Sequence, residues 1–211
     1  MDDQITDLRA RELIERLASS TPTPGGGSAS ALAGAMGAAL VQMVVALTSG
    51  RPAAGGSERE LTEIAAAAAN SQSELLNLAD LDALAYAAVI RARRLAKETE
   101  RERAARAVQV AAATREATRA PMHIARMAAT VLDLAERLAP IGNRNAISDV
   151  GVAALLAASS MRGAALNVRI NVPYLDDEAL REEATVEIDR VLAGLDERER
   201  AIRAAVEARL G

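Results

Sequence analysis

The sequence contains no cysteine, phenylalanine or tryptophan, and its only aromatic residues are Tyr86 and Tyr174. A chain without cysteine cannot form disulfide bonds, thiolate zinc sites or iron–sulfur clusters, and it has no cysteine nucleophile. With so few aromatic residues, the core must be built mainly from alanine, leucine, valine and isoleucine. Because alanine is the best helix former and strands favour aromatic and β-branched residues, this composition predicts an all-α protein.

The chain has 211 residues, of which 50% are hydrophobic and 26% are charged. No linker interrupts it, so we expect a single domain over residues 1–211. The formal net charge of −4 at pH 7 is not that of a nucleic-acid-binding protein, and bases would find no row of aromatic rings to stack on. We therefore expect no nucleic-acid partner. The acidic start at residues 1–4 lacks the pattern of a signal peptide, so we expect a cytoplasmic protein.

Two long segments carry very little charge. From Ser28 to Ser49 no residue is charged, and a second helix rich in small residues is expected from about Ala146 to Asn171. The first segment is long enough to cross a bilayer, but it contains Gln42 and Thr48 and has no aromatic or basic residues at its ends. Small residues let neighbouring helices pack closely, so a buried central helix is favoured over a membrane span. We expect no membrane partner.

Amphipathic segments surround these two helices in the sequence. Pro121 should end or kink one of them, Glu102 and Arg106 have the i,i+4 spacing of a helical ion pair, and Ser28 and Asp176 are candidate N-caps. The sequence therefore predicts a bundle of about six helices, with two buried small-residue helices at its centre. The amphipathic segments are residues 5–18, 57–95, 124–138 and 177–210, and Ser57 to Glu60 has the form of a capping box. Residues 91–119 are densely charged in both signs, as is typical of a solvated helix surface.

A glycine-rich loop precedes the first small-residue helix. Pro24, Gly25, Gly26 and Gly27 lead into Ser28. Backbone N–H groups at such a helix start, together with the helix dipole, can bind an anion or a developing negative charge. The alternative is a tight entry into a crowded helix. The loop is not a P-loop, because no Gly-Lys-Ser/Thr follows, and it is not a Rossmann turn, because no strand precedes it.

Asp82 and Tyr86 are four residues apart and therefore share one face of a helix. Small apolar neighbours would desolvate the carboxylate, which would raise its proton affinity, as an acid/base catalyst requires. The alternative is an ordinary surface aspartate. Asp80 should point elsewhere.

Asparagine and aspartate side chains recur along the second small-residue helix. Asp149 shares a face with Asn145, and Asn167 shares one with Asn171, but the two pairs are about 27 Å apart by helical rise. One small substrate cannot touch both pairs within one subunit. Polar groups in an apolar helix need partners, so the alternative to a substrate-binding role is hydrogen bonding between helices.

A metal site is not expected. His123 is the only histidine, and no dense cluster of carboxylates and histidine is placed on one face. A Ser-His-Asp triad could form within one subunit only around this residue.

Three motifs occur in order along nearly the whole chain, and together they closely resemble the cyclodeaminase/cyclohydrolase family of folate one-carbon enzymes. The first is the glycine-rich loop with the small-residue helix behind it, the second is Asp82 with Ala85 and Tyr86, and the third combines Gly142 and Asn143 with two segments of the later helix. The residues concerned are 20–28, 31–40, 43–44 and 47–48 for the first motif, and 142–143, 147–153 and 163–171 for the third.

The resemblance implies an all-helical homodimer or larger assembly that acts on a tetrahydrofolate carrying a one-carbon unit, with no prosthetic group and no metal. Two reactions occur in the family: hydrolysis of 5,10-methenyltetrahydrofolate to 10-formyltetrahydrofolate, and ring closure of 5-formiminotetrahydrofolate with loss of ammonia. The family's acid/base aspartate falls on Asp82. Tyr86, Asn143 and Asp149 could orient the pterin and water, and residues 24–28 and Asn167 complete the expected substrate site.

The helix signature at residues 162–168 resembles the stand-alone cyclohydrolases, so we expect a methenyltetrahydrofolate cyclohydrolase. The alternatives are a formiminotetrahydrofolate cyclodeaminase and a repurposed or non-catalytic helical dimer. The sequence departs from the family pattern at two places: Arg51–Gly56 replaces a basic run, and Leu95-Ala96-Lys97 replaces Leu-Pro-Lys. Both departures concern how a polyglutamate tail would be held.

Overall fold

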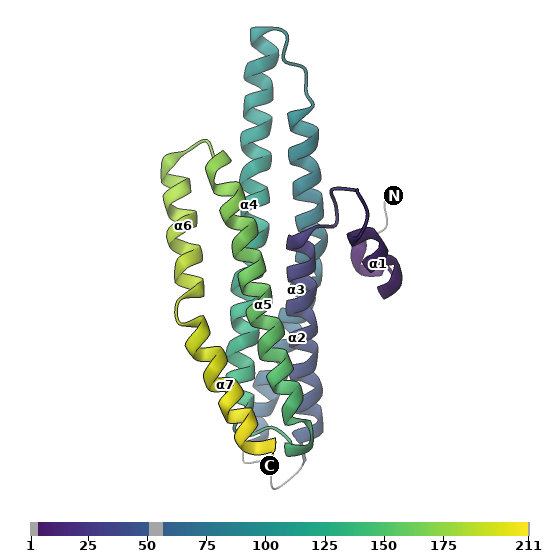
Figure 1. Cartoon of the computed structure of the whole chain (residues 1–211), viewed down its shortest axis with the longest axis vertical. Helices are drawn as coiled ribbons and strands as arrows, with labels where there is room; N and C mark the ends of the chain where they lie inside the picture. Colours follow the sequence, from purple (N-terminus) through teal and green to yellow (C-terminus); the bar gives the residue numbers. More distant parts are fainter. Residues whose placement is uncertain (1–3, 51–56, 211) are drawn as a thin grey trace.

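The computed structural model describes residues 4–50 and 57–210, and within these ranges it contains helices and no strands (Figure 1). Four long helices, α2 to α5, form the centre, and α6 and α7 cover one side of α4 and α5. The all-α bundle expected from the composition is confirmed. The helices are α1 (Ala10–Leu17), α2 (Gly26–Thr48), α3 (Glu58–Arg93), α4 (Glu100–Leu138), α5 (Ile147–Asn171), α6 (Glu178–Leu192) and α7 (Leu195–Leu210), with short 3₁₀ helices at Ile5–Asp7, Arg144–Ala146 and Val172–Tyr174.

The two small-residue helices, α2 and α5, pack directly against each other. A Cβ atom built on Gly34 would lie 2.8 Å from Ser160 Oγ, and one built on Gly163 would lie 2.3 Å from Ser30 Oγ. Such distances leave no room for a side chain, so glycine on each helix lets a serine of the other approach. The close packing expected from the small residues of these helices is confirmed.

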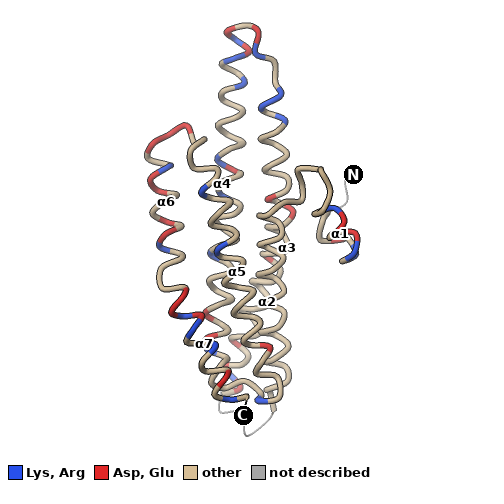
Figure 2. The backbone as a smooth tube through the Cα atoms, viewed as in Figure 1, with Lys and Arg blue, Asp and Glu red and all other residues tan. Residues whose placement is uncertain are grey.

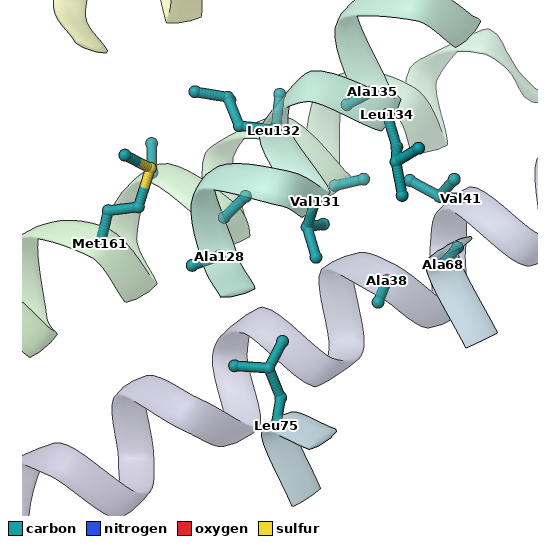
Figure 3. Packing of buried hydrophobic residues seen from close by; sticks show 14 of the residues in the cluster. Ala38, Val41, Ala68, Leu75, Ala128, Val131, Leu132, Leu134, Ala135 and Met161 are labelled. Carbon is teal, nitrogen blue, oxygen red and sulfur yellow. The ribbon is translucent and has the colours of Figure 1, made fainter. Parts of the chain in front are cut away.

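The core is built from alanine and branched aliphatic side chains that all four central helices contribute. Figure 3 shows Val131 of α4 close to Ala38 of α2, with Leu75 from α3 and Met161 from α5 nearby. All four side chains are buried. Alanine at the contacts allows the helix backbones to approach closely, so a well-packed core forms with few large side chains.

Pro121 does not end α4, which was one of the two outcomes expected from the sequence. The helix continues from Glu100 to Leu138, and Pro121 is buried inside it. Proline has no N–H to donate to the carbonyl four residues earlier, which is that of Ala117. The side-chain Nδ2 of Asn171 on α5 donates to this carbonyl at 2.8 Å. A hydrogen bond between helices therefore replaces the bond that the proline removes.

The predicted last helix is two helices, and Gly194 lies between them with a φ of 70°. A backbone in this left-handed region favours glycine, which explains why the chain turns here. The cap of the preceding turn also differs from expectation, because Asp177 and not Asp176 caps α6 through the N–H of Ala179.

Two further local expectations are corrected at helix starts. Gly25 and not Ser28 is the N-cap of α2, so the helix begins three residues earlier than expected. Glu102 forms a capping box with Thr99 at the start of α4 and no ion pair with Arg106. The expected cap at Ser57 is confirmed, since its hydroxyl accepts from the N–H of Glu60 at 3.1 Å.

The N-terminal segment is held by a buried carboxylate. Asp80 of α3 accepts hydrogen bonds from the N–H of Ile5 and the hydroxyl of Thr6, both at 2.7 Å. Asp80 therefore points away from Asp82, as expected from the helix geometry, and its role is structural.

α2 and α5 each leave one apolar stripe uncovered. The two spans Gly26–Thr48 and Arg144–Tyr174 are long and apolar enough to cross a membrane, but only half of the most apolar window of each is buried. Large exposed side chains on this surface include Met36 and Met43 of α2 and Val152 and Leu166 of α5. The two helices are central, as expected, but they are not covered all round. We call this surface the α2/α5 face.

The C-terminal part of α3 and the N-terminal part of α4 extend beyond the other helices as a hairpin (Figure 1). We call residues 84–113 the arm. Lysine and arginine gather on the arm, with acidic residues at its turn (Figure 2). Residues 91–106 contain seven lysine and arginine residues and three glutamates, in a chain whose net charge is −4.

Candidate active site

A cavity of about 240 Å³ lies at the base of the arm, where the start of α2, the middle of α3 and α4 and the end of α5 meet. It contains the helical pair Asp82 and Tyr86 together with the glycine-rich loop. The sequence placed these two motifs more than fifty residues apart in the chain, and the fold brings them together. The lining residues are Pro22, Thr23, Gly25, Gly26, Gly27, Asp82, Tyr86, Ala117, Asn167, Ile170 and Asn171.

Asp82 is the largely buried carboxylate of this cavity. Desolvation by burial raises its pKa above the usual 3.8, and hydrogen bonds from the side chain and backbone of Ser28 oppose this rise. No arginine, lysine or histidine of the described residues forms a salt bridge with Asp82. A carboxyl with a raised pKa and no cationic partner binds its proton more readily than an ordinary aspartate, as a group that exchanges protons with a bound molecule requires.

The first turn of α2 lies directly against Asp82. A Cβ atom built on Gly27 would lie 2.2 Å from Asp82 Oδ1 and 2.4 Å from Oδ2, so only glycine allows this approach. The N–H groups of the first turn have no partners within the helix. The positive end of the α2 dipole therefore points at the carboxylate and at whatever binds beside it.

Two other polar side chains have separate roles at the cavity. Asn167 Nδ2 donates to the carbonyl of Gly163 at 2.9 Å within α5. Its Oδ1 therefore remains as an acceptor in the cavity wall. Asn171 is committed to the carbonyl of Ala117, the hydrogen bond between helices that was the alternative to substrate binding. The ring of Tyr86 is 45% exposed and lies at the entrance.

Two residues of the predicted substrate site are buried and do not line the cavity. Pro24 is buried behind the loop, and the neighbours that reach the cavity are Pro22 and Thr23. The hydroxyl of Ser28 donates to the carbonyl of Ala79 at 2.8 Å, and Asp82 Oδ2 lies 3.4 Å from the same oxygen. The shorter contact joins α2 to α3, and the longer one is the side-chain contact that opposes the rise in the pKa of Asp82.

Asn143 and Asp149 are at the opposite end of α5, away from Asp82. The N–H of Asn143 donates to Thr48 Oγ1 at 2.9 Å, and its Nδ2 donates to the carbonyl of Leu47 at 2.7 Å. These bonds tie the loop before α5 to the end of α2. As expected from the helical rise, the 25-residue helix α5 separates these two residues from Asn167 and the cavity within one chain.

Pro22, Ala117 and Ile170 were not foreseen as cavity residues. Pro22 belongs to the same motif as the glycines, so the loop composition could have indicated it. Nothing in the local sequence around Ala117 or Ile170 distinguishes them from other apolar helix positions. Only the packing of α4 and α5 brings them to the cavity.

A larger cavity of about 480 Å³ lies between α4 and α6, but its cations are already paired. Arg115 binds both carboxylate oxygens of Asp176, and Arg126 forms a close ion pair with Glu187. His123 lines this cavity, with its Nδ1 3.8 Å from Glu74 Oε1. Across residues 4–50 and 57–210, no group of three histidine, aspartate or glutamate side chains is placed to hold a metal ion.

An all-helical bundle with a small cavity, a desolvated carboxylate and an adjoining helix N-terminus has the features of an acid/base site for a small molecule. The chain belongs to the formiminotransferase-cyclodeaminase family, whose model matches residues 9–190. The family expected from the three motifs is therefore confirmed.

Relatives with both activities of the family are similar to this chain. A methenyltetrahydrofolate cyclohydrolase of Methylorubrum extorquens is 44% identical over 85% of this chain and 86% of that protein. The formimidoyltransferase-cyclodeaminase of Mus musculus is 29% identical over 99% of this chain, which spans only 38% of the mouse protein. The crystal structure of formiminotetrahydrofolate cyclodeaminase from Thermotoga maritima superposes with a TM-score of 0.86 at 27% identity and covers 97% of this chain and 98% of that one.

Proposed function

We propose that this protein is a methenyltetrahydrofolate cyclohydrolase that converts 5,10-methenyltetrahydrofolate to 10-formyltetrahydrofolate, with Asp82 as its acid/base group. The observation that carries the proposal is the desolvated Asp82 carboxylate facing the first turn of α2 in a cavity. The cyclohydrolase of Methylorubrum extorquens, 44% identical over most of both chains, supports the choice of reaction.

The geometry suggests how Asp82 would act. The methenyl carbon lies between N5 and N10 and carries a positive charge. The ionised Asp82 accepts a proton from water as the water oxygen bonds to this carbon. Asp82 then returns the proton to N5, the bond between the carbon and N5 breaks, and the formyl group stays on N10 while the hydroxyl proton leaves to solvent. Overall, water is consumed and one proton is released.

The other cavity groups would bind and orient the substrate. Asn167 Oδ1 can accept a hydrogen bond from a pterin N–H, and the Tyr86 ring can cover one side of the substrate at the entrance. The N–H groups at Gly26 and Gly27 can donate hydrogen bonds to the water oxygen that has bonded to the methenyl carbon. No prosthetic group is proposed, and cytoplasmic localisation remains a prediction from the sequence.

A cyclodeaminase activity is the second candidate, because the superposed Thermotoga maritima structure is that of a formiminotetrahydrofolate cyclodeaminase. In that reaction N10 attacks the formimino carbon and ammonia leaves. The same carboxyl could take the proton from N10 and protonate the leaving nitrogen. A non-catalytic member of the family is the remaining alternative.

An assay with both substrates decides between these reactions. We expect purified protein to remove the absorbance of 5,10-methenyltetrahydrofolate, and to do so much faster than it forms that absorbance from 5-formiminotetrahydrofolate. The Asp82→Asn variant is the control for uncatalysed hydrolysis. A faster reaction with 5-formiminotetrahydrofolate would establish the cyclodeaminase instead, and no turnover of either compound would refute the enzymatic proposal.

We further propose that two copies pair through the α2/α5 face. Two helices of about 23 residues side by side present roughly 35 Å by 20 Å, or about 700 Å² per copy, close to the ~800 Å² of a standard interface. The face is apolar, with Leu166 67% exposed. Antiparallel pairing would also bring Asn143 and Asp149 of one copy toward the Asp82 end of the other.

The mass in solution tests this pairing. We expect light scattering after size exclusion to give twice the chain mass of 22.0 kDa. Met36→Asp should produce monomers, because it places a charge at the middle of the face. Val186→Asp is the matched control, since Val186 is 62% exposed, close to the 55% of Met36, but lies on α6. A monomeric wild-type protein, or equal dissociation in both variants, would rule the face out.

A further inference from the structure

We propose that Arg93 and Arg106 form a carboxylate-binding subsite on the arm that holds the glutamate tail of the substrate. This inference rests on the proposed folate substrate, and it adds residues that bind the part of the substrate far from the reacting carbon.

The cavity around Asp82 is too small for the whole substrate. Its volume of about 240 Å³ lies below the ~300–1,000 Å³ of pockets that enclose drug-sized ligands. If the pterin and the one-carbon unit occupy it, the aminobenzoyl group and the glutamate must lie outside. The entrance is at the base of the arm, where Tyr86 is exposed, so the arm is the surface next to the part of the substrate that protrudes.

Arg93 and Arg106 lie on the sides of α3 and α4 that also line the cavity. Arg93 is eleven residues after Asp82 on α3, and Arg106 is eleven residues before Ala117 on α4. Eleven residues are about three helical turns with roughly 20° left over and a rise of about 16 Å. Each arginine is therefore above a cavity residue of its own helix, at a distance comparable with the length of an aminobenzoylglutamate unit.

The two arginines are adjacent, and their backbone and ring contacts hold them in place. Arg106 donates from Nε and Nη2 to the carbonyl of Arg93, both at 3.2 Å. The guanidinium of Arg93 stacks on the ring of Tyr174, 5.1 Å from its centre. Tyr174 follows α5, which provides Asn167 and Ile170 to the cavity wall. Contacts from α3, α4 and the end of α5 thus fix the positions of both cations.

Neither arginine has an acidic partner within the described residues. This distinguishes them from the arginines around the larger cavity, such as Arg115 and Arg126, which are paired with carboxylates. Two neighbouring cations without a counter-charge attract an anion, and arginine binds carboxylates through paired N–H donors. The glutamate tail is the anionic part of a tetrahydrofolate, and further γ-linked glutamates would extend toward Lys97 and Arg101 at the end of the arm.

The test compares substrates with and without the tail. In Arg93→Gln/Arg106→Gln, we expect the KM for 5,10-methenyltetrahydrofolate to rise about tenfold or more, with kcat within about twofold of wild type. The KM for 5,10-methenyltetrahydropteroate, which lacks glutamate, should not change. We also expect the wild-type protein to prefer a triglutamate over a monoglutamate, and this preference to diminish in the double variant.

Arg91→Gln is the matched control. Arg91 is exposed and only two residues from Arg93, but it lies nine residues after Asp82, on the opposite side of α3. An unchanged KM in the double variant would overturn the subsite. An equal rise of KM in Arg91→Gln would also overturn it, because it would indicate general electrostatic attraction of the anionic substrate. An equal rise of KM for the pteroate substrate would do the same, because it would indicate damage to the cavity.

Equilibrium binding separates failure of the subsite from failure of the proposed reaction. The wild-type protein could turn over neither 5,10-methenyltetrahydrofolate nor 5-formiminotetrahydrofolate. The subsite would still be supported if the protein bound tetrahydrofolate more tightly than tetrahydropteroate, and if this difference were lost in the double variant but kept in Arg91→Gln. Equal affinity for the two compounds, or no binding of either, would overturn it. Turnover with unaltered tail dependence in the double variant would overturn the subsite alone.

Discussion

Asp82→Asn should reduce turnover of 5,10-methenyltetrahydrofolate by roughly 10²–10⁴-fold, the contribution usual for a general acid/base group. The amide keeps the size and polarity of the carboxyl but cannot accept the proton of the attacking water or return it to N5. Because it still fills the cavity, KM should change little. Stopped-flow or steady-state absorbance measurements of the methenyl group would provide both constants.

Asp80→Asn is the control for this variant. Asp80 is two residues away but points to the N-terminal segment, where it accepts from Ile5 and Thr6. Asp80→Asn should retain kcat and lose stability. The amide has one NH2 group in place of a carboxylate oxygen, and this donor would face the N–H of Ile5 or the hydroxyl of Thr6, which are themselves donors. Wild-type turnover by Asp82→Asn would exclude the proposed role. A similar loss of turnover in Asp80→Asn would indicate a structural cause for both.

The pH dependence follows from the raised pKa of Asp82. As the base that receives the proton of water, Asp82 must be ionised, so kcat/KM should fall as the pH drops through its pKa. Burial raises that pKa, and the acidic limb should therefore lie above the 3.8 of an ordinary aspartate. A limb at or below this value would contradict a desolvated base.

Stability should change in the opposite direction from activity. A raised folded-state pKa means that the ionised carboxylate is disfavoured in the folded protein relative to the unfolded chain. At pH 7, Asp82→Asn removes this penalty, so its Tm should equal or exceed that of the wild type. As the pH falls through the folded-state pKa, the wild-type carboxyl takes up its proton and the difference should narrow. Active sites often contain groups that are needed for activity but lower the stability of the folded protein.

The sequence predicted those parts of the fold that depend on local chemistry. Alanine-rich periodic segments and the cap at Ser57 indicated the helices, and the small residues of the two charge-poor segments indicated close helix packing. The sequence did not show that the helix continues past Pro121, because this depends on a residue fifty positions later. Asn171 satisfies the carbonyl of Ala117 only after α4 and α5 have packed.

The candidate site was predictable in part for a similar reason. Asp82 and Tyr86 share a helix face by spacing alone, and the glycine-rich loop is a local motif. That the two motifs meet depends on how α2 packs against α3, and the motifs pointed to this meeting only through the family resemblance. The arginines of the arm were interpreted as part of a solvated helix surface. Arg93 and Arg106 differ from their neighbours only once the hairpin places both above the cavity.

Gly27→Ala should inactivate the protein without unfolding it. The added methyl group would lie 2.2–2.4 Å from the carboxylate atoms of Asp82, a separation that real Cβ atoms do not show. Either Asp82 rotates or the first turn of α2 moves away, and the carboxylate leaves its position by about an ångström, which can cost about 10²-fold in rate. Alanine is the better helix former by about 1 kcal/mol, so the helix itself should not be weakened. We therefore expect kcat/KM to fall about a hundredfold.

Gly151→Ala is the matched control, because it makes the same change within α5, where the new methyl group would lie 3.4 Å from Val206 Cγ1, away from the cavity. It should retain wild-type turnover. The turnover of Gly26→Ala should lie between those of Gly27→Ala and Gly151→Ala, since its methyl group would be 3.4 Å from Asn167 Nδ2 in the cavity wall. A crystal structure of Gly27→Ala should show Asp82 displaced. Full activity of Gly27→Ala would mean that the contact between α2 and Asp82 is not needed for the chemistry, and it would remove the close approach of the helix start from the mechanism.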